Sequence, residues 1–279
     1  MNERRPAAWP VLLTFVVLLF AIQVAGALVL AAWAYLSLPA GNAAAVPAQI
    51  QVLISTPVGL SVVVLMSAVP LILVAVVGGL ASGEPLADRL RTRVRGVRWG
   101  LVPLAVLGLA ALSHGLNSLI QLSGLADQGT LRLMGDVIAS ARGWELLLLG
   151  AVLALGAGTA EELFFRGFLQ QRLSRRFTPR TGVLVAAVCF GLMHADWVQG
   201  PAAALLGLYL GWVVERAGSV VPAMVAHAVN NSIAVFAARW ELPESTAIHV
   251  AVLLASLLLG TVLVLAQERA YRRASSPIR

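Results

Sequence analysis

The sequence predicts an all-α membrane protein, a polytopic transmembrane bundle of about eight spans with both termini in the cytoplasm. Composition is the first observation: 59% of the 279 residues are hydrophobic and 12% are charged, whereas soluble domains carry about 25% charged residues. The second is that apolar residues fall into windows of ~20, the length that crosses a bilayer. The third is an uneven distribution of arginine between those windows, which sets orientation in membrane proteins.

The predicted spans are joined by short connections. They cover residues 9–38, 52–81, 99–122, 143–176, 181–197, 200–215, 218–238 and 246–266. The first window exceeds the ~7 to 15 apolar residues of a signal-peptide core, so we expect it to be retained as a span. Pro57 and Pro70 lie in the second window and are expected to bend it.

Two connecting segments are predicted to contain surface helices. In residues 84–98, Leu86, Leu90 and Val94 recur at helical spacing between five arginines, a pattern typical of a basic amphipathic helix. We interpret it as a positively charged loop that sets topology, with a lipid-docking or substrate-docking surface as the alternative. Leu131, Met134 and Ile138 predict a short helix on the opposite surface.

All 20 basic residues are arginine. The predicted spans place 17 of them on the side of the N-terminus and only Arg132, Arg142 and Arg239 on the other, which indicates that both termini are cytoplasmic. We expect a multi-pass protein of the cell (plasma or inner) membrane, with anionic lipid at its cytoplasmic face. Because the arginines cluster between apolar windows, the net charge of +7 does not indicate nucleic-acid binding. The all-arginine, alanine-rich composition suggests a prokaryotic protein.

The tryptophans give an independent check on the spans. All seven lie near predicted span ends, as an aromatic belt requires. We divide the chain into residues 1–142 with the first three spans, residues 143–238 as a core of four spans, and residues 239–279 with the last span and a basic tail. The lone Cys189 excludes an intrachain disulfide and is expected to be a packing residue.

The fourth span contains G-T-A-E-E-L-F-F-R-G-F at residues 158–168, which places two carboxylates and an arginine in an apolar window. Each charge costs at least ~2.5 to 3.5 kcal/mol at bilayer depth, so the cluster needs a compensating role. Glu162 and Arg166 are four residues apart and share a helix face. Glu161 points about 100° away and needs partners from other spans.

Two later spans supply polar partners. F-G-L-M-H places Phe190 and His194 on one face, and H-A-V-N-N places His227 and Asn231 on one face. At ~1.5 Å per residue, these groups and Glu162 lie about 14 to 21 Å from the predicted cytoplasmic ends, so we expect them to converge.

A hydrated pocket of this composition suits hydrolysis of an amide bond. A glutamate accepts a proton from water, a histidine holds the water or a metal, and an amide stabilises the oxyanion. From the residues alone, a structural ion pair and a proton or ion pathway remain alternatives.

Together the motifs E-E-L-F-F-R, F-G-L-M-H and H-A-V-N-N resemble the signatures E-E-x-x-x-R, F-x-x-x-H and H-x-x-x-N. These belong to the CAAX-protease and bacteriocin-processing family of intramembrane endopeptidases, which includes Abi-type and prenyl-protein endopeptidases. The resemblance covers residues 146–236. It implies a catalytic site made of Glu161, Glu162, Arg166, His194, His227 and Asn231.

The resemblance also implies a role for each residue. Glu161 is the water-activating base, supported by Glu162 and Arg166. His194 holds the water or a metal, while His227 and Asn231 stabilise the oxyanion. A Zn²⁺ ion held by Glu161, His194 and His227 and a metal-free glutamate mechanism use the same residues, so both are open. No other cofactor is expected.

The predicted function is therefore endopeptidase hydrolysis of a membrane-associated peptide or protein, without a presumption that the substrate is prenylated. The sequence contains no H-E-x-x-H, G-x-G-D or G-x-S-G motif of other intramembrane proteases. The alternatives are a catalytically silent relative that acts as a partner-binding or immunity-type membrane protein, and an ion-coupled transporter.

Overall fold

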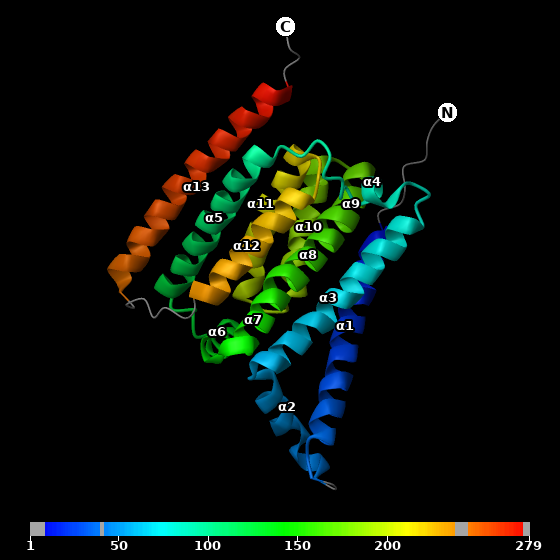
Figure 1. Cartoon of the computed structure of the whole chain (residues 1–279), viewed down its shortest axis with the longest axis vertical. Coiled ribbons are helices and arrows are strands. Elements are labelled where there is room, and N and C mark those ends of the chain that lie inside the picture. The colour runs from blue at the N-terminus through cyan, green and yellow to red at the C-terminus, as the bar shows by residue number, and fades with distance from the viewer. Residues whose placement is uncertain (1–8, 40–41, 238–244, 276–279) are drawn as a thin grey trace.

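The computed structural model describes residues 9–39, 42–237 and 245–275, and within them the chain forms helices and no strand (Figure 1). The α-helices are α1 (Trp9–Leu36), α2 (Val46–Ile54), α3 (Pro57–Leu80), α4 (Leu86–Arg89), α5 (Val102–Leu122), α6 (Leu131–Ser140), α7 (Gly143–Ala151), α8 (Gly158–Glu161), α9 (Gln171–Arg176), α10 (Pro179–Met193), α11 (Gln199–Ala217), α12 (Val221–Ala237) and α13 (Thr246–Ser275). Two short 3₁₀ turns, η1 (Ala43–Ala45) and η2 (Trp99–Leu101), and two π-helical segments, η3 (Val152–Ala157) and η4 (Glu162–Gln170), complete the set.

The long helices run back and forth along one direction, and the first turn of α1 and the last turn of α13 lie at the same end of the bundle (Figure 1). Within the described residues, five stretches are long and apolar enough to cross a membrane: Trp9–Leu36, Pro57–Leu80, Trp99–Leu122, Gly143–Arg176 and Thr246–Arg272. Shorter apolar helices include Pro179–Met193 and Val221–Ala237. An all-helical membrane bundle is confirmed, while the count of eight spans and the cytoplasmic side of the termini stay predictions.

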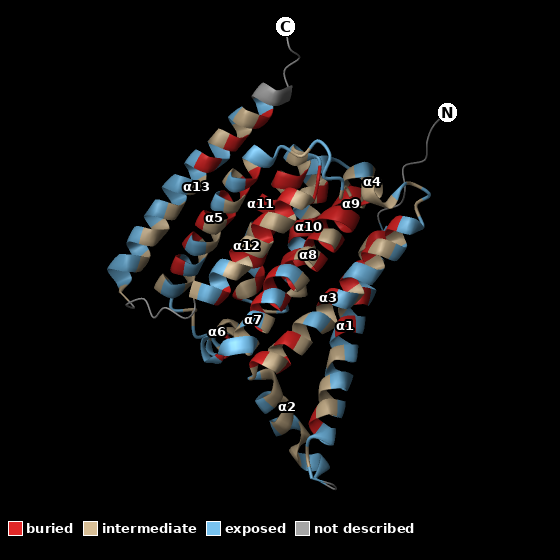
Figure 2. Cartoon of the chain, in the orientation of Figure 1, coloured by how far each residue is buried: buried red, intermediate tan, exposed pale blue. Residues whose placement is uncertain are grey.

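Buried residues concentrate in the central helices α8 to α12, whereas α1 and α13 are largely exposed (Figure 2). Phe164, Phe165 and Phe168 lie in η4, within the long helical stretch Gly143–Arg176. They belong to the main core together with buried residues of α1, α3 and α10. Outer positions carry exposed apolar side chains such as Leu28 and Leu258. A water-soluble protein rarely exposes apolar surface of this extent, so these helices fit contact with lipid.

The expected continuous second span is wrong at residues 55–56, where α2 ends and α3 begins. Thr56 adopts an extended conformation, and its Oγ1 accepts a hydrogen bond of 3.0 Å from the Gly59 N–H. Pro57 follows at the first helical position, where a missing N–H has no cost. Pro57 therefore starts a helix instead of bending one, and Pro70 lies inside α3.

The predicted surface helix at residues 84–98 is wrong beyond its first turn, because only α4 forms. Arg91 has a φ of 52° and Gly96 a φ of 90°, and a right-handed helix cannot continue through such residues. The backbone instead bonds to the α11–α12 connection: the Val220 N–H donates to the Arg91 carbonyl at 2.9 Å, and Ser219 Oγ donates to the Arg93 carbonyl at 3.0 Å. The short helix expected on the opposite surface is confirmed as α6.

Other helix ends differ from the predictions by a few residues. Helix α10 ends at Met193, so His194 occupies its C-terminal cap and does not lie inside a longer helix. Helix α13 continues past the predicted end at residue 266 to Ser275. The predicted positions of Ala238, Arg239 and Trp240 lie outside the described residues.

Candidate active site

The helix that carries the charged cluster leaves α-helical geometry twice, in η3 and η4. A π-helical segment bonds residue i to i+5 and is rare outside functional sites. Its wider turn rotates less per residue than an α-helix, which brings residues four apart close to vertical alignment. Glu162 opens η4 and Arg166 lies in its middle, so this geometry favours a direct contact between their side chains.

Glu162 and Arg166 form a buried ion pair, which confirms that they share a face. Arg166 Nη1 donates to Glu162 Oε1 at 2.8 Å, and the two side chains are 0% and 1% exposed. Within the described residues, Glu162 Oε2 and Arg166 Nη2 are buried without a hydrogen-bond partner. Burying two charges costs several kcal/mol per ion before their attraction is counted. Buried polar atoms without partners are uncommon in native proteins, and they are found at functional sites among other places.

His227 of α12 lies between the two adjacent glutamates. Its Nδ1 is 2.9 Å from Glu162 Oε1, and its Nε2 is 3.7 Å from Glu161 Oε2. A carboxylate only accepts hydrogen bonds, so Nδ1 is the donor to Glu162, and Nε2 is the ring nitrogen on the side of Glu161. The partner that Glu161 needed from another span is therefore His227. The Glu161 side chain is 15% exposed, which makes it the accessible carboxylate of the two.

Phe190 of α10 connects the remaining groups. The Arg166 guanidinium lies 4.4 Å from its ring centroid, a cation–π contact. The rings of His194 and His227 meet Phe190 edge to face at 5.0 and 6.1 Å. The sequence singled out Phe190 only by its spacing from His194, because no pattern within one span reveals its contacts to Arg166 and His227 of two other spans.

His194 is fixed by its own helix. Its Nδ1 lies 2.9 Å from the Phe190 carbonyl oxygen. A carbonyl only accepts, so Nδ1 is the donor. When the ring is neutral, Nε2 carries the lone pair, which can accept a hydrogen bond from water or bind a metal.

Asn231 lies on α12 one turn beyond His227 and is partly buried. Its Nδ2 donates to the Leu153 carbonyl at 3.0 Å, and Leu153 belongs to η3. One of its two amide hydrogens is thus used in a hydrogen bond that joins α12 to η3. Four predicted site residues are in direct contact, namely Glu161, Glu162, Arg166 and His227. His194 joins them through Phe190, and Asn231 through η3.

Two residues near the site were not singled out from the sequence. A Cβ atom at Gly207 of α11 would lie 3.1 Å from both Arg166 Nη2 and a Phe190 ring carbon, so glycine lets α11 approach the ion pair. No sequence signal marks that approach.

Asp196 was also missed, although an aspartate just before a helix is a readable N-cap signal. It accepts hydrogen bonds from the Val198 and Gln199 N–H groups at 2.8 and 2.7 Å and from the Thr130 N–H at 2.6 Å. It therefore holds the turn after His194 against the segment that precedes α6. Burial raises the pKa of Asp196, but the hydrogen bonds from Gln199, Thr130 and Val198 outweigh it and lower the pKa overall.

The positions of the histidine nitrogens and of Glu161 bear on the predicted zinc site. In both histidines Nδ1 is the hydrogen-bonded nitrogen, an arrangement that is common in metal-bound histidines, but Nε2 of His227 already lies 3.7 Å from Glu161 Oε2. Within the described part of the chain, however, no group of three His, Cys, Asp or Glu side chains is placed to hold a metal ion. Glu161, His194 and His227 therefore do not form a three-ligand zinc site in this arrangement, and a zinc requirement stays a prediction. Cys189 is buried in the main core, in keeping with a packing role.

Comparison with known proteins gives a family match. Residues 143–233 match the family model described as type II CAAX prenyl endopeptidase, Rce1-like. A search of curated proteins and a search of solved structures each returned no match. The matched segment contains all six predicted site residues, and it confirms the family resemblance over that part of the chain. The match supports an intramembrane endopeptidase of the CAAX type in general.

Proposed function

We propose that this protein is an intramembrane endopeptidase in which Glu161 activates the attacking water. The observation that carries the proposal is the unequal environment of two neighbouring carboxylates. Glu162 is fully buried and held by Arg166 and His227, whereas Glu161 is partly exposed and lies 3.7 Å from Nε2 of His227. A positioned group and a reactive group of the same chemical type are thus distinguished by their surroundings.

The reaction begins with addition of water to the peptide carbonyl. Glu161 takes one proton as the water oxygen bonds to the carbonyl carbon, and the carbonyl oxygen becomes an oxyanion. His194 accepts a hydrogen bond from the same water through Nε2 and fixes its direction. The second amide hydrogen of Asn231 is a donor for the oxyanion, since its first is bound to Leu153.

Collapse of the tetrahedral intermediate completes the reaction. The C–N bond breaks as Glu161 returns its proton to the departing nitrogen, which leaves a new amine and a new carboxylic acid, whose remaining proton passes to solvent. His227 donates through Nδ1 to Glu162 and has Nε2 toward Glu161, so it holds the two glutamates in position relative to each other. The oxyanion role that the resemblance implies for His227 requires a proton on Nε2.

The test compares Glu161→Gln with Glu162→Gln in the purified full chain. Glu161→Gln should lower kcat by ~10² to 10⁴-fold with little change in Tm, because it removes the base. Glu162→Gln should also lower the free energy of unfolding, by about 3 to 5 kcal/mol, because it leaves Arg166 buried without its counter-ion. Glu145→Gln on α7 is the control and should behave as wild type. Wild-type activity in Glu161→Gln would show that the assigned mechanism is wrong.

Substrates for this assay come from comparing membrane peptides of cells that express wild type and Glu161→Gln. If no peptide differs and the purified chain cleaves no peptide library member, the partner-binding alternative replaces the endopeptidase. Coupled ion flux across proteoliposomes would favour the transporter. The same assay tests zinc: loss of activity with a chelator and recovery with added Zn²⁺ would support a metal mechanism, and full activity in a metal-free preparation would exclude it.

A further inference from the structure

A groove of about 680 Å³ lies between α1, α3 and the segment formed by η4 and α9, and neither Glu161 nor Glu162 lines it. Its walls are apolar and include Val11 of α1 with Val74 and Val77 of α3. One end is lined by three guanidinium groups, those of Arg89, Arg172 and Arg175. Its volume is in the range of ~300 to 1,000 Å³ that is usual for small-molecule sites. The groove therefore has an apolar body and a cationic end.

Arg172 is held rigidly at that end. Its Nη2 donates to the Gly78 carbonyl at 2.6 Å, and its guanidinium lies 4.2 Å from the Phe168 ring centroid. Its Nη1 is buried and has no hydrogen-bond partner among the described residues. A buried donor without a partner costs about 1 to 3 kcal/mol, and more when it is charged. The groove thus contains a fixed cationic donor that an anionic acceptor would satisfy.

The charges around Arg172 are unbalanced. Glu84 accepts from Arg175 Nη2 at 2.9 Å and lies 3.6 Å from Arg89 Nη1. One carboxylate therefore faces three guanidinium groups. Burial lowers the pKa of Arg89, and repulsion by Arg175 lowers it further, while Glu84 raises it in part. An added anion would relieve this repulsion.

We propose that the groove binds an anionic phospholipid, with the phosphate among the guanidinium groups of Arg89, Arg172 and Arg175 and one acyl chain between α1 and α3. Guanidinium groups form strong charge-assisted hydrogen bonds to phosphate oxygens. The arginine distribution predicts that this end lies at the cytoplasmic interface, where anionic headgroups are found. The apolar walls match an acyl chain, which a free phosphate lacks.

The groove is separate from the candidate active site. Phe168 faces the groove, and Phe164 stacks on it at 5.6 Å on the opposite side from Arg172. Phe165 next meets Phe190 at 5.2 Å. A layer of aromatic side chains therefore lies between the lipid site and the glutamates, and the proposal does not depend on peptidase activity.

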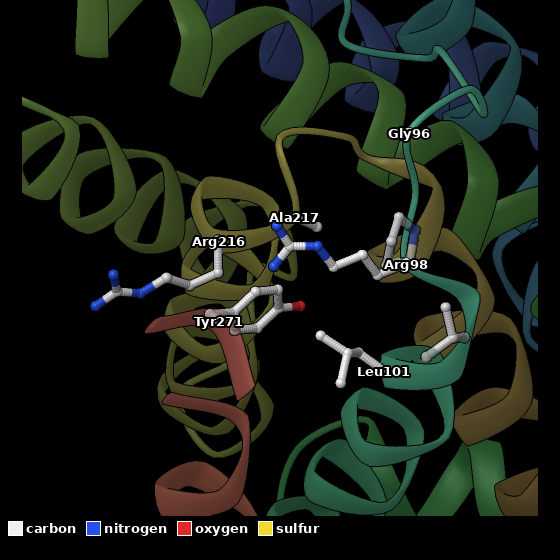
Figure 3. Close-up of a pocket in the computed structure, with 8 residues that line it drawn as sticks. Gly96, Arg98, Leu101, Arg216, Ala217 and Tyr271 are labelled. Carbon is white, nitrogen blue, oxygen red and sulfur yellow. The ribbon is translucent and has the colours of Figure 1, made fainter. Parts of the chain in front are cut away.

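A second pocket does not fit the same ligand. Figure 3 shows it around Arg98, Arg216 and Tyr271, with the Arg216 side chain extending away from Arg98. Its volume is about 90 Å³, too small for a headgroup with an acyl chain. Arg216 Nη2 lies 2.5 Å from Glu268 Oε1. The carboxylate of Glu268 offsets the positive charge of Arg216, which weakens the attraction of this pocket for an anion.

The experiment measures lipid binding to the delipidated full chain in detergent, by native mass spectrometry. The probes are phosphatidylglycerol and phosphatidylcholine with identical acyl chains. We expect phosphatidylglycerol to bind at least about tenfold more tightly, and Arg172→Gln to remove most of that difference. Arg95 is exposed and lies on the same predicted side of the membrane. Arg95→Gln is therefore the matched control and should bind as wild type. Equal binding of both lipids, or unchanged binding in Arg172→Gln, would overturn the proposal.

Two further arms test the acyl chain and the source of the phosphate. Val77→Trp should block the groove and weaken phosphatidylglycerol binding about tenfold or more, whereas Val69→Trp, exposed on α3 outside the groove, should not. This arm also decides the outcome if Arg172→Gln does not fold. Inorganic phosphate should compete only weakly. If inorganic phosphate binds as tightly as phosphatidylglycerol, or if Val77→Trp binds the lipid normally, the groove is not a phospholipid site.

Discussion

At the scale of single residues, Phe190 and Gly207 hold the arginine that fixes Glu162. The guanidinium of Arg166 lies over the Phe190 ring, and the bare Cα of Gly207 faces its Nη2. Neither contact adds a reactive group, but each limits where Arg166 can lie. Glu162 accepts hydrogen bonds from both Arg166 and His227. A shift of the Arg166 guanidinium would therefore displace Glu162 and, through it, His227, which is the contact of Glu161.

Gly207→Ala tests this restraint. The added methyl would lie 3.1 Å from Arg166 Nη2 and from a Phe190 ring carbon, which forces one of them to move. We expect the free energy of unfolding to fall by about 1 to 3 kcal/mol and kcat to fall with it.

The control is Gly260→Ala on α13, where nothing lies within 4 Å of the added Cβ. Both changes gain the same helix propensity, so Gly260→Ala should be neutral or stabilising by up to about 1 kcal/mol. Chemical unfolding and a peptidase assay measure the two effects. Equal stability of the two variants would show that α11 can yield at this point.

Spacing predicted part of the site at this scale. The Glu162–Arg166 contact follows from residues four apart on a helix, and the need of Glu161 for a distant partner follows from its angle. That the partner is His227, 65 residues from Glu162, depends on how α12 packs. Helix packing is decided by side-chain shape along the whole interface, so the role of Phe190 could not be read from its own span.

At the scale of elements, the helical stretch Gly143–Arg176 and the turn after α10 determine where the reactive groups lie. The π-helical geometry of η3 and η4 could not be predicted, because hydrophobic periodicity does not register one extra residue per turn. The turn after α10 was wrongly predicted as helix to residue 197. Ala195 has a φ of 49°, and Asp196 accepts hydrogen bonds from the Val198 and Gln199 N–H groups at the start of α11.

Asp196→Asn tests the turn through its pH dependence. The folded-state pKa of Asp196 is below its ordinary value, so the charged form stabilises the folded chain above that value. The contribution is lost as the pH falls through the lower folded-state pKa. We expect wild type to have the higher Tm at neutral pH, and the difference from Asp196→Asn to shrink below about pH 4.

Thermal unfolding from neutral to acidic pH measures this difference. Asp136→Asn on α6 is the control, because that side chain is 76% exposed. It should follow wild type at each pH. A constant difference between wild type and Asp196→Asn would mean that the charge of Asp196 does not stabilise the turn.

At the scale of the whole molecule, composition and apolar windows predicted a helical membrane bundle, and the structure has one. Hydropathy windows do not detect the break at Thr56, which is a local helix cap in which Thr56 accepts from the Gly59 N–H. They also could not locate the loop at residues 90–98, because it is set by hydrogen bonds to the α11–α12 connection. Helix order nevertheless agrees: the basic segment after α3, the end of α9 and the α11–α12 connection lie at the same end of the bundle (Figure 1). That shared end carries most of the arginines.

The arginine distribution predicts that this end is cytoplasmic, and labelling of single cysteines in intact cells tests it. Cys189 is buried and is first replaced by alanine. Arg95→Cys and Gln128→Cys then place one thiol in an exposed loop at each end of the bundle. A membrane-impermeant maleimide should label Gln128→Cys in intact cells and Arg95→Cys only after the membrane is opened, because positively charged loops stay inside. The reverse pattern would place the groove arginines, and with them the proposed lipid site, in the outer leaflet.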